Sequence, residues 1–573
     1  MTTTIHETDV LIIGGGGGGM YAAINAADMG SKVIIVSKAL LGRGGCSSTF
    51  GYVGANPPQK TQAVVPVDST ENKSFDDVMK YYGHYLADQE FAKKASSYIP
   101  TFYHRMEKMG LYFRRGDDGT IISSGRFGFG SMAPKFGNTG KGIMDILRSQ
   151  VFLRKIPILE ESTGVTLIHV GGRVVGAIVY DYIHGTLHEI RAKAVILACG
   201  HVNWLWDRTT GTREQAGNGL AMAFRAGAEL AGLEMVWWHI ADMAHPNAWM
   251  RSHMYPGNLP MMTEVAEYYN SKGELFFQSK MYPGAQPSYY LQCKHLARQI
   301  KAGLARPDGG YYASFGKIDP FIFNEFTTMG SYIRKLGLDP QKDRIECAMS
   351  SHQQRGGVAI NHDMATRVDG LYIAGSLAAD YISGIVTVCW EAEIAARSAT
   401  EYARRTTHVV NDTAKLQVEK QFDSLLAATP RDPIAPSFVK DQIRQLMGRE
   451  MDYFKSGEKI ERAIEGLRKM RHTLVPRMQV SSKDPVANYE LLDAIDVPDM
   501  LDVAELMCIA SLNRTESRGS FYRLDYPLVD NKNWLKNIYL SDDVSEPKIR
   551  LQDVNLKYVR PADESADFLT SEY

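Results

Sequence analysis

The sequence predicts an α/β fold: a parallel sheet with helices on its faces, an inserted α+β segment, a helical domain and an irregular C-terminal tail. Three observations predict it. Short apolar runs rich in β-branched residues lead into glycine at Val10–Ile13, Ala192–Gly200 and Gly370–Ser376, as buried parallel strands do. The chain from Asp412 to Ser511 is charged and has apolar residues at helical spacing. Finally, Asn513–Tyr573 is polar and aromatic, with few helical signals.

The first apolar run opens a strand–helix–strand unit. Val10–Ile13 is followed by six glycines, and then by small residues at helical spacing over Met20–Met29. Gly30 ends that helix, and Ser31–Val36 is a second buried strand. The unit therefore has the order expected of a βαβ motif.

Gly14, Gly16 and Gly19 occupy the G-x-G-x-x-G positions of this unit. Glycine allows a tight turn there, a close approach of the backbone to a pyrophosphate, and close packing of helix on strand. The helix N-terminus adds N–H donors and a positive dipole for phosphate. These features predict a Rossmann-type dinucleotide-binding domain, with a merely flexible glycine loop as the alternative. The second strand ends at Ser37-Lys38, where the general motif has an acidic residue for the ribose.

Composition restricts the class of protein. The 573 residues exceed one ordinary domain, and the net charge of −1 argues against non-specific binding to nucleic acid. Because no run approaches about 18 apolar residues, we expect no membrane span. The N-terminal stretch lacks the basic and apolar regions of a signal peptide, so we expect a cytoplasmic location. None of the six cysteines forms a C-x-x-C pair, so we expect no metal site or iron–sulfur cluster in this chain.

Further elements follow in order. Leu41–Asn56 is a loop of glycine and small residues where a cofactor should lie, unless it is merely flexible. Val165–Ile190 alternates apolar and polar residues and predicts a β-meander ahead of the separate strand Ala192–Gly200. Helices are expected over Asn218–Ala231 and Thr387–Arg404.

Four motifs agree with one family. They are the opening unit ending in Ser37-Lys38-Ala39, the strand ACG followed by Ala216–Leu220, GLYIAG at 370–375, and RTESRGSFYRLD over Arg514–Asp525. In this order they resemble the flavoprotein subunits of succinate dehydrogenase and fumarate reductase, over nearly the whole chain. L-aspartate oxidase and the adenylylsulfate reductase α subunit belong to the same superfamily.

This resemblance implies FAD on the glycine turn and a capping domain over its isoalloxazine ring. The expected segments are 1–238 and 351–406 for the FAD-binding domain, 239–350 for the capping (substrate) domain, 407–511 for the helical domain and 512–573 for the tail. The FAD contacts implied are Gly14, Gly16, Gly18, Gly19, Ser37, Lys38, Gly44, Gly45, Cys46, Gly51, Ala198, Cys199, Gly200, Asn218, Gly375, Ser376, Val386 and Thr387.

Three of these positions depart from the family pattern. Asn218 stands where the family often has Asp, and Ser376 where it often has Glu; both can still form hydrogen bonds. Many members attach FAD covalently through a histidine in the loop after the second strand. Gly45 aligns with that histidine, and no His lies between Ser37 and Gly54, so we expect non-covalent FAD.

For the substrate, the resemblance implies histidines and cations around an activated C=C bond. His352 matches the family's His-x-x-x-Gly-Gly, and Arg355 in the same segment supplies a cation unless it forms a surface salt bridge. His239 matches a substrate-binding histidine, although Ile240 breaks the signature that follows. A packed histidine is the alternative, and His245 is a second candidate.

Other matches are looser. Thr263 and Glu264 resemble the family's Thr-Glu pair, although the following spacing is short and Glu264 is otherwise a surface carboxylate. Lys294 aligns with the proton-donating arginine of the family, and Arg298 is its rival one turn on. Lysine cannot form the same bidentate contact, because it is a point charge on a flexible stem.

The second substrate-binding arginine of the family is missing, since residues 371–396 contain no Arg. A dicarboxylate would then be poorly paired, which argues against plain succinate or fumarate. The candidates to flank a larger or aromatic substrate, with core packing as the alternative, are Trp237, Trp238, Trp249 and Tyr381.

Together these features predict an FAD-dependent oxidoreductase that transfers hydride between flavin N5 and a C=C or CH–CH bond beside a carboxylate or thioester. One alternative is sulfur chemistry like that of adenylylsulfate reductase; another is an electron-transfer subunit without its own substrate. Because the chain has no cluster cysteines, we expect a separate iron–sulfur or ferredoxin-like subunit, through which any membrane contact is made.

Overall fold

The structure is a computed structural model that describes most of the chain. The described residues are 1–48, 50, 53, 75, 79, 83–113, 115, 119, 121, 139–242, 267–278, 289–317, 334–335, 337–339, 341–382, 384–561 and 564–569. Within these residues we find no helix with the length and apolar character that a membrane crossing needs.

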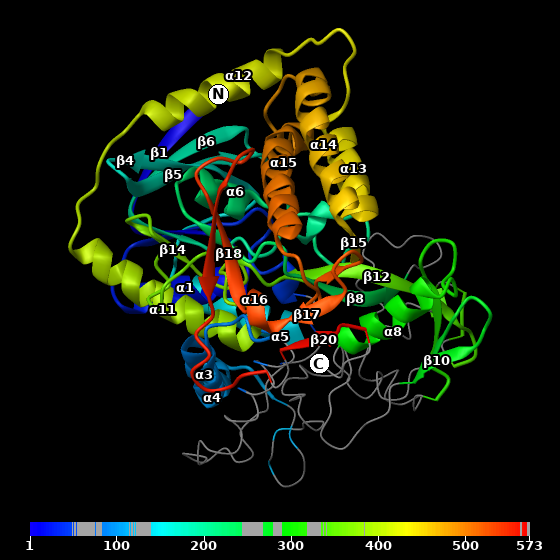
Figure 1. Ribbon diagram of the computed structural model, residues 1–573. Coiled ribbons are helices and arrows are strands. Elements are labelled where there is room, and N and C mark those ends of the chain that lie inside the picture. The colour runs from blue at the N-terminus through cyan, green and yellow to red at the C-terminus, as the bar shows by residue number, and fades with distance from the viewer. Residues whose placement is uncertain are drawn as a thin grey trace.

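A seven-stranded sheet forms the centre of the fold (Figure 1). Its strands are β1 (Thr2–Ile13), β2 (Val33–Val36), β3 (Ile158–Leu159), β4 (Ser162–Val170), β5 (Arg173–Asp181), β6 (Thr186–Leu197) and β14 (Leu371–Ile373). Their order is β3-β2-β1-β6-β5-β4, and β14 also pairs with β6. The pairs around β1, β2, β3 and β14 are parallel, whereas β4, β5 and β6 form an antiparallel meander. The predicted α/β class is confirmed.

Strand β6 corrects the prediction of a meander followed by a separate strand. The two are one continuous strand, Thr186–Leu197. The reason is β1, which begins at Thr2 and pairs with β6 along its whole length, up to Ile13 opposite Leu197. Strand β5 pairs with the first half of β6 on the side opposite β1. The polar residues in this half of β6 are therefore held in an extended conformation as well.

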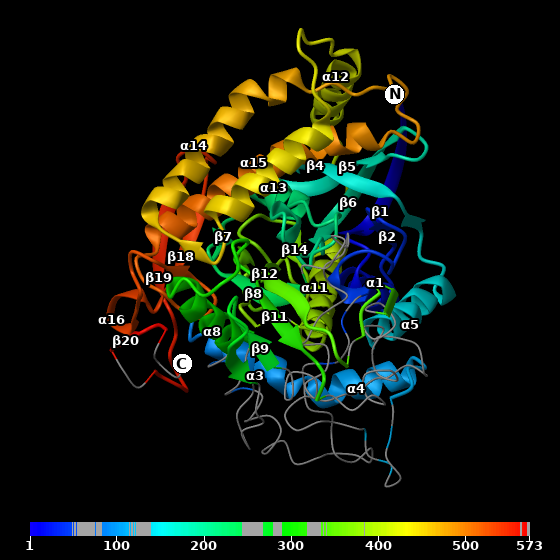
Figure 2. The same ribbon diagram turned by 90° about the vertical axis from the view of Figure 1, so that its right-hand side faces the viewer.

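Helices pack on this sheet, around the glycine turn, or against another helix of the same group. They are α1 (Gly17–Asp28), α3 (Gln89–Ser97), α4 (Ile99–Lys108), α5 (Thr139–Leu153), α6 (Asn218–Arg225) and α11 (Ile385–Arg404). Helix α1 packs against α11 and α5 (Figure 2). Helix α6 is shorter than predicted, because Gly227 leaves it with φ of 93° and Leu230–Ala231 forms strand β7. Short 3-10 turns are η1 (Cys46–Ser48), η3 (Asn203–Leu205) and η4 (Val475–Arg477).

A second, five-stranded antiparallel sheet lies within the inserted part of the chain. Its strands are β8 (Val236–Asp242), β9 (Glu267–Tyr269), β10 (Leu275–Gln278), β11 (Tyr311–Ser314) and β12 (Ile345–Gln354), in the order β10-β9-β11-β12-β8. Helix α8 (Tyr289–Lys301) packs against β8. Since β8 leaves the dinucleotide domain and β12 returns to it, this pair of strands joins the two parts of the molecule (Figure 2).

The helical domain follows. Its helices are α12 (Thr413–Ala427), α13 (Pro436–Glu450), α14 (Gly457–Thr473) and α15 (Tyr489–Asn513), with the short strand β15 (Phe454–Lys455) between α13 and α14. Helices α13, α14 and α15 pack together as a bundle, whereas α12 lies apart on β4 and β5 (Figure 1). Helix α15 is almost wholly buried, so it faces the bundle and the central domain at once.

The C-terminal tail contains short strands and one four-residue helix rather than being irregular throughout. Its elements are β16 (Tyr522–Arg523), β17 (Leu528–Asp530), α16 (Asn531–Trp534), β18 (Lys536–Ser541), β19 (Lys548–Asp553) and β20 (Ser565–Asp567). Strand β18 joins β7, which is also paired with β13 (Gly357–Val358), and β16 pairs with β15. The tail therefore ties the central and helical parts together through backbone pairing, which leaves little helical pattern in the sequence.

Candidate active site

The glycine turn is built by backbone contacts. Strand β1 ends at Ile13, and α1 begins at Gly17 with no side-chain cap on its N-terminus. Gly14 has φ of +132°, and a Cβ added there would lie 2.2 Å from the carbonyl oxygen of Ala198. A Cβ on Gly19 would lie 1.8 Å from the carbonyl oxygen of Gly14. Only glycine fits these positions, and the first-turn N–H groups of α1 are available to a phosphate.

A cleft opens beside this turn, where the carboxyl ends of β1, β2, β6 and β14 meet. Its free space is about 1020 Å³ when the part open to solvent is included. The predicted FAD contacts that line it are Gly14, Gly16, Gly18, Ser37, Lys38, Gly44, Gly45, Cys46, Ala198, Cys199, Gly200, Asn218, Gly375 and Ser376. Four segments that are far apart in the sequence thus converge on one cleft.

Four predicted contacts differ from this group. Gly19 packs helix on strand, as its steric contact with Gly14 requires, and is not part of the lining. Val386 and Thr387 belong to the first turn of α11 and do not line the cleft either. Gly51 lies outside the described residues.

Sequence reasoning missed a further set of lining residues. They include Ser162, Thr163 and Gly164 at the start of β4, and His201, Glu214 and Gln215. Ser162 reaches the cleft because its N–H donates to the carbonyl oxygen of Ser37 at 2.9 Å. No periodic pattern marks such a backbone pairing between distant segments. Gln215 accepts from the Cys46 thiol at 3.4 Å; burial raises the pKa of that thiol to about 11.

The cleft fits FAD. Its glycine turn and the uncapped α1 N-terminus suit a pyrophosphate, and Ser37 offers a hydroxyl where the general motif has a ribose-binding carboxylate. Buried polar atoms with no partner among the described residues include Glu214 Oε2 and His201 Nε2. These groups make a polar lining ready for a ligand that brings its own donors and acceptors.

A second group of predicted residues meets where β8 pairs with β12. The rings of His239 and His352 stack with centroids 3.9 Å apart. Thr210 Oγ1 and His352 Nδ1 lie 2.6 Å apart. Burial, followed by a neighbouring histidine and then by the charge of Arg355, holds the pKa of both rings well below the usual 6.5. Both imidazoles are therefore neutral at neutral pH.

Arg355 joins this group through an indole. Its guanidinium carbon lies 3.7 Å from the centroid of the Trp237 ring, and Trp237 packs edge-on against His239 with 5.3 Å between centroids. Only 2% of Arg355 is exposed, so the alternative of a surface salt bridge is wrong. The result is a buried cation beside two neutral imidazoles, which we call the His–Arg group (His239, His352 and Arg355).

Lys294 lies elsewhere on the inserted part, between α8 and the tail. Its ammonium nitrogen is 4.6 Å from the centroid of the Phe568 ring, and its rival Arg298 donates to the carbonyl oxygen of Leu569 at 2.8 Å. Burial, and then Arg298, lower the pKa of Lys294 to about 7. Thr263, Glu264, His245 and Trp249 lie outside the described residues.

The remaining aromatic candidates pack inside the protein. Trp238 points to the face of β8 opposite Trp237, because side chains alternate along a strand, and its ring packs on Trp206. Tyr381 has φ of 61°, and its hydroxyl lies against Gly232, where an added Cβ would be 2.1 Å away. These two side chains therefore follow the core-packing alternative.

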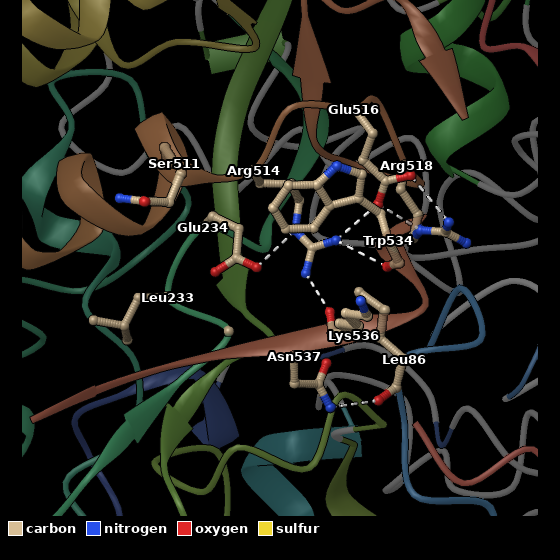
Figure 3. A network of polar contacts seen from close by, with 12 residues as sticks. Leu86, Leu233, Glu234, Ser511, Arg514, Glu516, Arg518, Trp534, Lys536 and Asn537 are labelled. Atoms are coloured by element: carbon tan, nitrogen blue, oxygen red, sulfur yellow. Dashed lines mark hydrogen bonds and ion pairs between the residues drawn. The ribbon is translucent and has the colours of Figure 1, made fainter. Parts of the chain in front are cut away.

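The tail motif binds Glu234, which lies two residues before β8 (Figure 3). Arg514 Nε donates to Glu234 at 2.8 Å, Nη1 donates to Glu516 at 2.7 Å, and Nη2 donates to the carbonyl oxygen of Lys536 at 2.7 Å. Arg518 donates to both carboxylate oxygens of Glu516, from Nε to Oε1 at 2.9 Å and from Nη2 to Oε2 at 3.0 Å. Both Arg514 and Glu234 are fully buried. The motif thus anchors the segment that leads into the His–Arg group.

Comparison with known proteins agrees with this architecture. The FAD binding domain family matches residues 9–389, and the family described as fumarate reductase flavoprotein C-term matches residues 440–566. One subunit of the fumarate reductase (CoM/CoB) of Methanothermobacter marburgensis is 25% identical over 559 residues, covering 94% of this chain and 98% of that protein.

Two solved structures share the fold. E. coli quinol fumarate reductase FrdA superimposes with a TM-score of 0.85 at 21% identity, over 98% of this chain and 99% of that one. Adenylylsulfate reductase from Archaeoglobus fulgidus superimposes with a TM-score of 0.78 at 20% identity, over 98% of this chain and 97% of that one. From its matched residues and its cleft, the chain belongs to the FAD-binding flavoprotein family of the fumarate reductases and succinate dehydrogenases, and is an FAD-dependent oxidoreductase.

Proposed function

We propose that this chain transfers hydride between FAD and a carbon–carbon bond beside a carboxylate or thioester carbonyl. The observation that carries the proposal is the buried His–Arg group at the junction of β8 and β12. Neutral imidazoles donate hydrogen bonds, and a guanidinium carries a permanent charge, so together they suit the oxygens of a carboxyl or thioester group. When bound, FAD supplies the two-electron chemistry.

In this proposal the protein stabilises charge on the acceptor. Negative charge develops on the carbonyl oxygen as a hydride adds to the conjugated C=C bond, and fixed donors lower the energy of that state. Arg355 and His239 supply such donors from a buried position, where electrostatic interactions are stronger than in water. Thr210 engages Nδ1 of His352 and so orients Nε2, the other ring nitrogen.

We also propose Lys294 as the proton source for the second carbon. Its pKa of about 7 suits a group that gives up and regains a proton near neutral pH. Its contact with Phe568 places it beside the tail, so its role is tested separately from that of the His–Arg group.

The proposed acceptor carries one carboxylate or a thioester rather than two carboxylates. The stretch 371–396 contains no Arg, and Tyr381 within it packs on Gly232. A second buried carboxylate would therefore lack the cation that the family provides there.

The test is to reduce the bound flavin without oxygen and to follow its reoxidation by a panel of unsaturated acids and their CoA esters. Reoxidation by a member of the panel, lost in His352→Ala while the flavin spectrum is kept, is the expected result. If no compound reoxidises the flavin, the chain is an electron-transfer subunit without its own substrate. Full rates in both His352→Ala and Lys294→Ala would reject the assigned residues.

Sulfur chemistry is the second candidate, favoured by the missing arginine and by the shared fold with adenylylsulfate reductase. It predicts bleaching of the flavin spectrum by sulfite and reoxidation of the reduced flavin by adenylylsulfate. Neither effect is expected of an enzyme that acts only on carbon–carbon bonds.

We further propose that electrons reach the flavin from a separate iron–sulfur or ferredoxin-like subunit. The six cysteines are single, and no group of three His, Cys, Asp or Glu side chains in the described part of the chain could hold a metal ion. The relative from M. marburgensis is itself named as one subunit of its enzyme. Purification of this chain alone as an efficient oxygen-using oxidase would contradict the proposal.

A further inference from the structure

Lys38 stands at the edge of the FAD cleft and reaches into the helical domain. It follows β2, next to the position where the general motif has a ribose-binding carboxylate. Its ammonium donates to Asp496 Oδ1 at 2.6 Å and to Asn218 Oδ1 at 2.9 Å. Asp496 belongs to α15. Strand β2 is not followed by an acidic residue, and the carboxylate that binds Lys38 comes from the helical domain instead.

Asn218 also lines the cleft, at a position where the family often has Asp. The same helix, α15, holds its side chain. Its amide nitrogen donates to Asp496 Oδ1 at 3.0 Å and to Asp499 Oδ2 at 2.7 Å. The amide is therefore fixed, with its oxygen toward Lys38 and its nitrogen toward α15. One carboxylate oxygen of Asp496 thus orients two side chains that line the cleft.

Asp496 is itself built to stay charged. Only 1% of the residue is exposed, and its Oδ2 accepts from Lys440 of α13 at 2.9 Å. Burial by itself would raise the pKa of this carboxyl, but Lys38 and Lys440 lower it to about 2. The carboxylate is thus an acceptor throughout the physiological pH range.

We propose that Asp496 is a positioning residue for FAD, which holds Lys38 and Asn218 in their binding orientation and makes α15 part of the cofactor site. Without it, Lys38 has a long flexible stem and no carboxylate partner, and the Asn218 amide nitrogen keeps only its bond to Asp499. The inference concerns cofactor binding alone and does not depend on the proposed substrate.

Asp493 provides a matched control one turn earlier on α15. Its Oδ1 accepts from Lys440 at 2.6 Å, the same lysine that binds Asp496. Replacing Asp493 therefore disturbs the contact between α13 and α15 and leaves both bonds from Asp496 to the cleft wall.

The experiment titrates apoprotein with FAD and follows flavin fluorescence. Asp496→Asn is expected to raise the Kd for FAD at least tenfold, and Asp493→Asn less than twofold. In a protein that already carries Lys38→Met, adding Asp496→Asn is expected to raise the Kd for FAD less than threefold further. The rise in Tm on adding FAD should be smaller in Asp496→Asn than in the wild type, and unchanged in Asp493→Asn.

A Kd within twofold of the wild type in folded Asp496→Asn overturns the inference. So does an equal loss of affinity in Asp493→Asn, because the effect would then come from the packing of α13 on α15. If Asp496→Asn does not fold, Asp496→Glu and Asp493→Glu take their places, and equal Kd values in that pair also overturn it.

Discussion

His239 and His352 stack across two paired strands, with their rings 3.9 Å apart and inclined by 26°. The register of β8 and β12 shifts between Ser351 and Gln353, and the histidine at this irregularity meets the ring from the neighbouring strand. Two neutral imidazole rings are therefore stacked in the protein interior, near the guanidinium of Arg355.

Acid should destabilise this arrangement. Unfolded histidines take up protons near pH 6.5, whereas the low pKa values of His239 and His352 keep them unprotonated when folded, so stability falls as pH falls below about 6.5. Urea unfolding between pH 5 and 7.5 measures the slope. His352→Asn should make it shallower, and the exposed His472→Asn should not; equal slopes in wild type and His352→Asn would contradict the explanation.

Thr210 should matter through its hydroxyl. Thr210→Val removes the group 2.6 Å from His352 Nδ1 and is expected to lower turnover about tenfold or more, because the ring loses its fixed orientation. Thr210→Ser keeps the hydroxyl and should restore most of the rate. Steady-state kinetics checks both, and equal rates in the two variants would exclude this role.

Breaking the Arg514–Glu234 pair should cost about 3–5 kcal/mol of stability, since a buried charge is left without its partner. Arg514→Met tests this by chemical unfolding. Arg550→Met, which breaks the more exposed pair with Glu229, should cost about 1 kcal/mol or less. Similar losses in both variants would mean that the tail motif does not anchor the start of β8.

Tyr381→Phe should leave stability unchanged or raise it by about 1 kcal/mol, because its buried hydroxyl has no hydrogen-bond partner in the described part of the chain. Gly232→Ala should destabilise strongly, since the new Cβ would meet the Tyr381 ring. Thermal unfolding gives both values. A tenfold fall in turnover for Tyr381→Phe would instead assign the hydroxyl to substrate.

Lys294 should make stability rise with pH. Its pKa is about 7 in the folded protein and near 10.5 in the unfolded chain, so between these values the unfolded state binds more protons. Lys294→Met should flatten the rise between pH 7 and 10. Lys455, whose pKa burial also lowers to about 7, should contribute in the same direction, and Lys455→Met is the parallel variant. An unchanged slope in Lys294→Met would show that burial does not depress the pKa of this lysine.

Much of the fold was predictable because its signals are local. Residues close in the sequence specify the glycine turn, its flanking strands and the strand ends within Ala192–Gly200 and Gly370–Ser376. Most predicted FAD contacts also line one cleft. The continuous β6 and the short α6 were not predictable, because pairing with β1 and the break at Gly227 depend on partners or backbone angles without a periodic signal.

The sequence by itself determined that this chain has a dinucleotide turn with the residues of an FAD flavoprotein, since steric demands at glycine act within a few residues. Only the tertiary structure decided that Arg355 lies on Trp237, that Lys294 meets Phe568, and that Asp496 holds Lys38 from 458 positions away. Those contacts come from packing between segments that are distant in the sequence. Burial and charge pairing decide which side chains meet there, and the spacing of residues along the chain does not predict it.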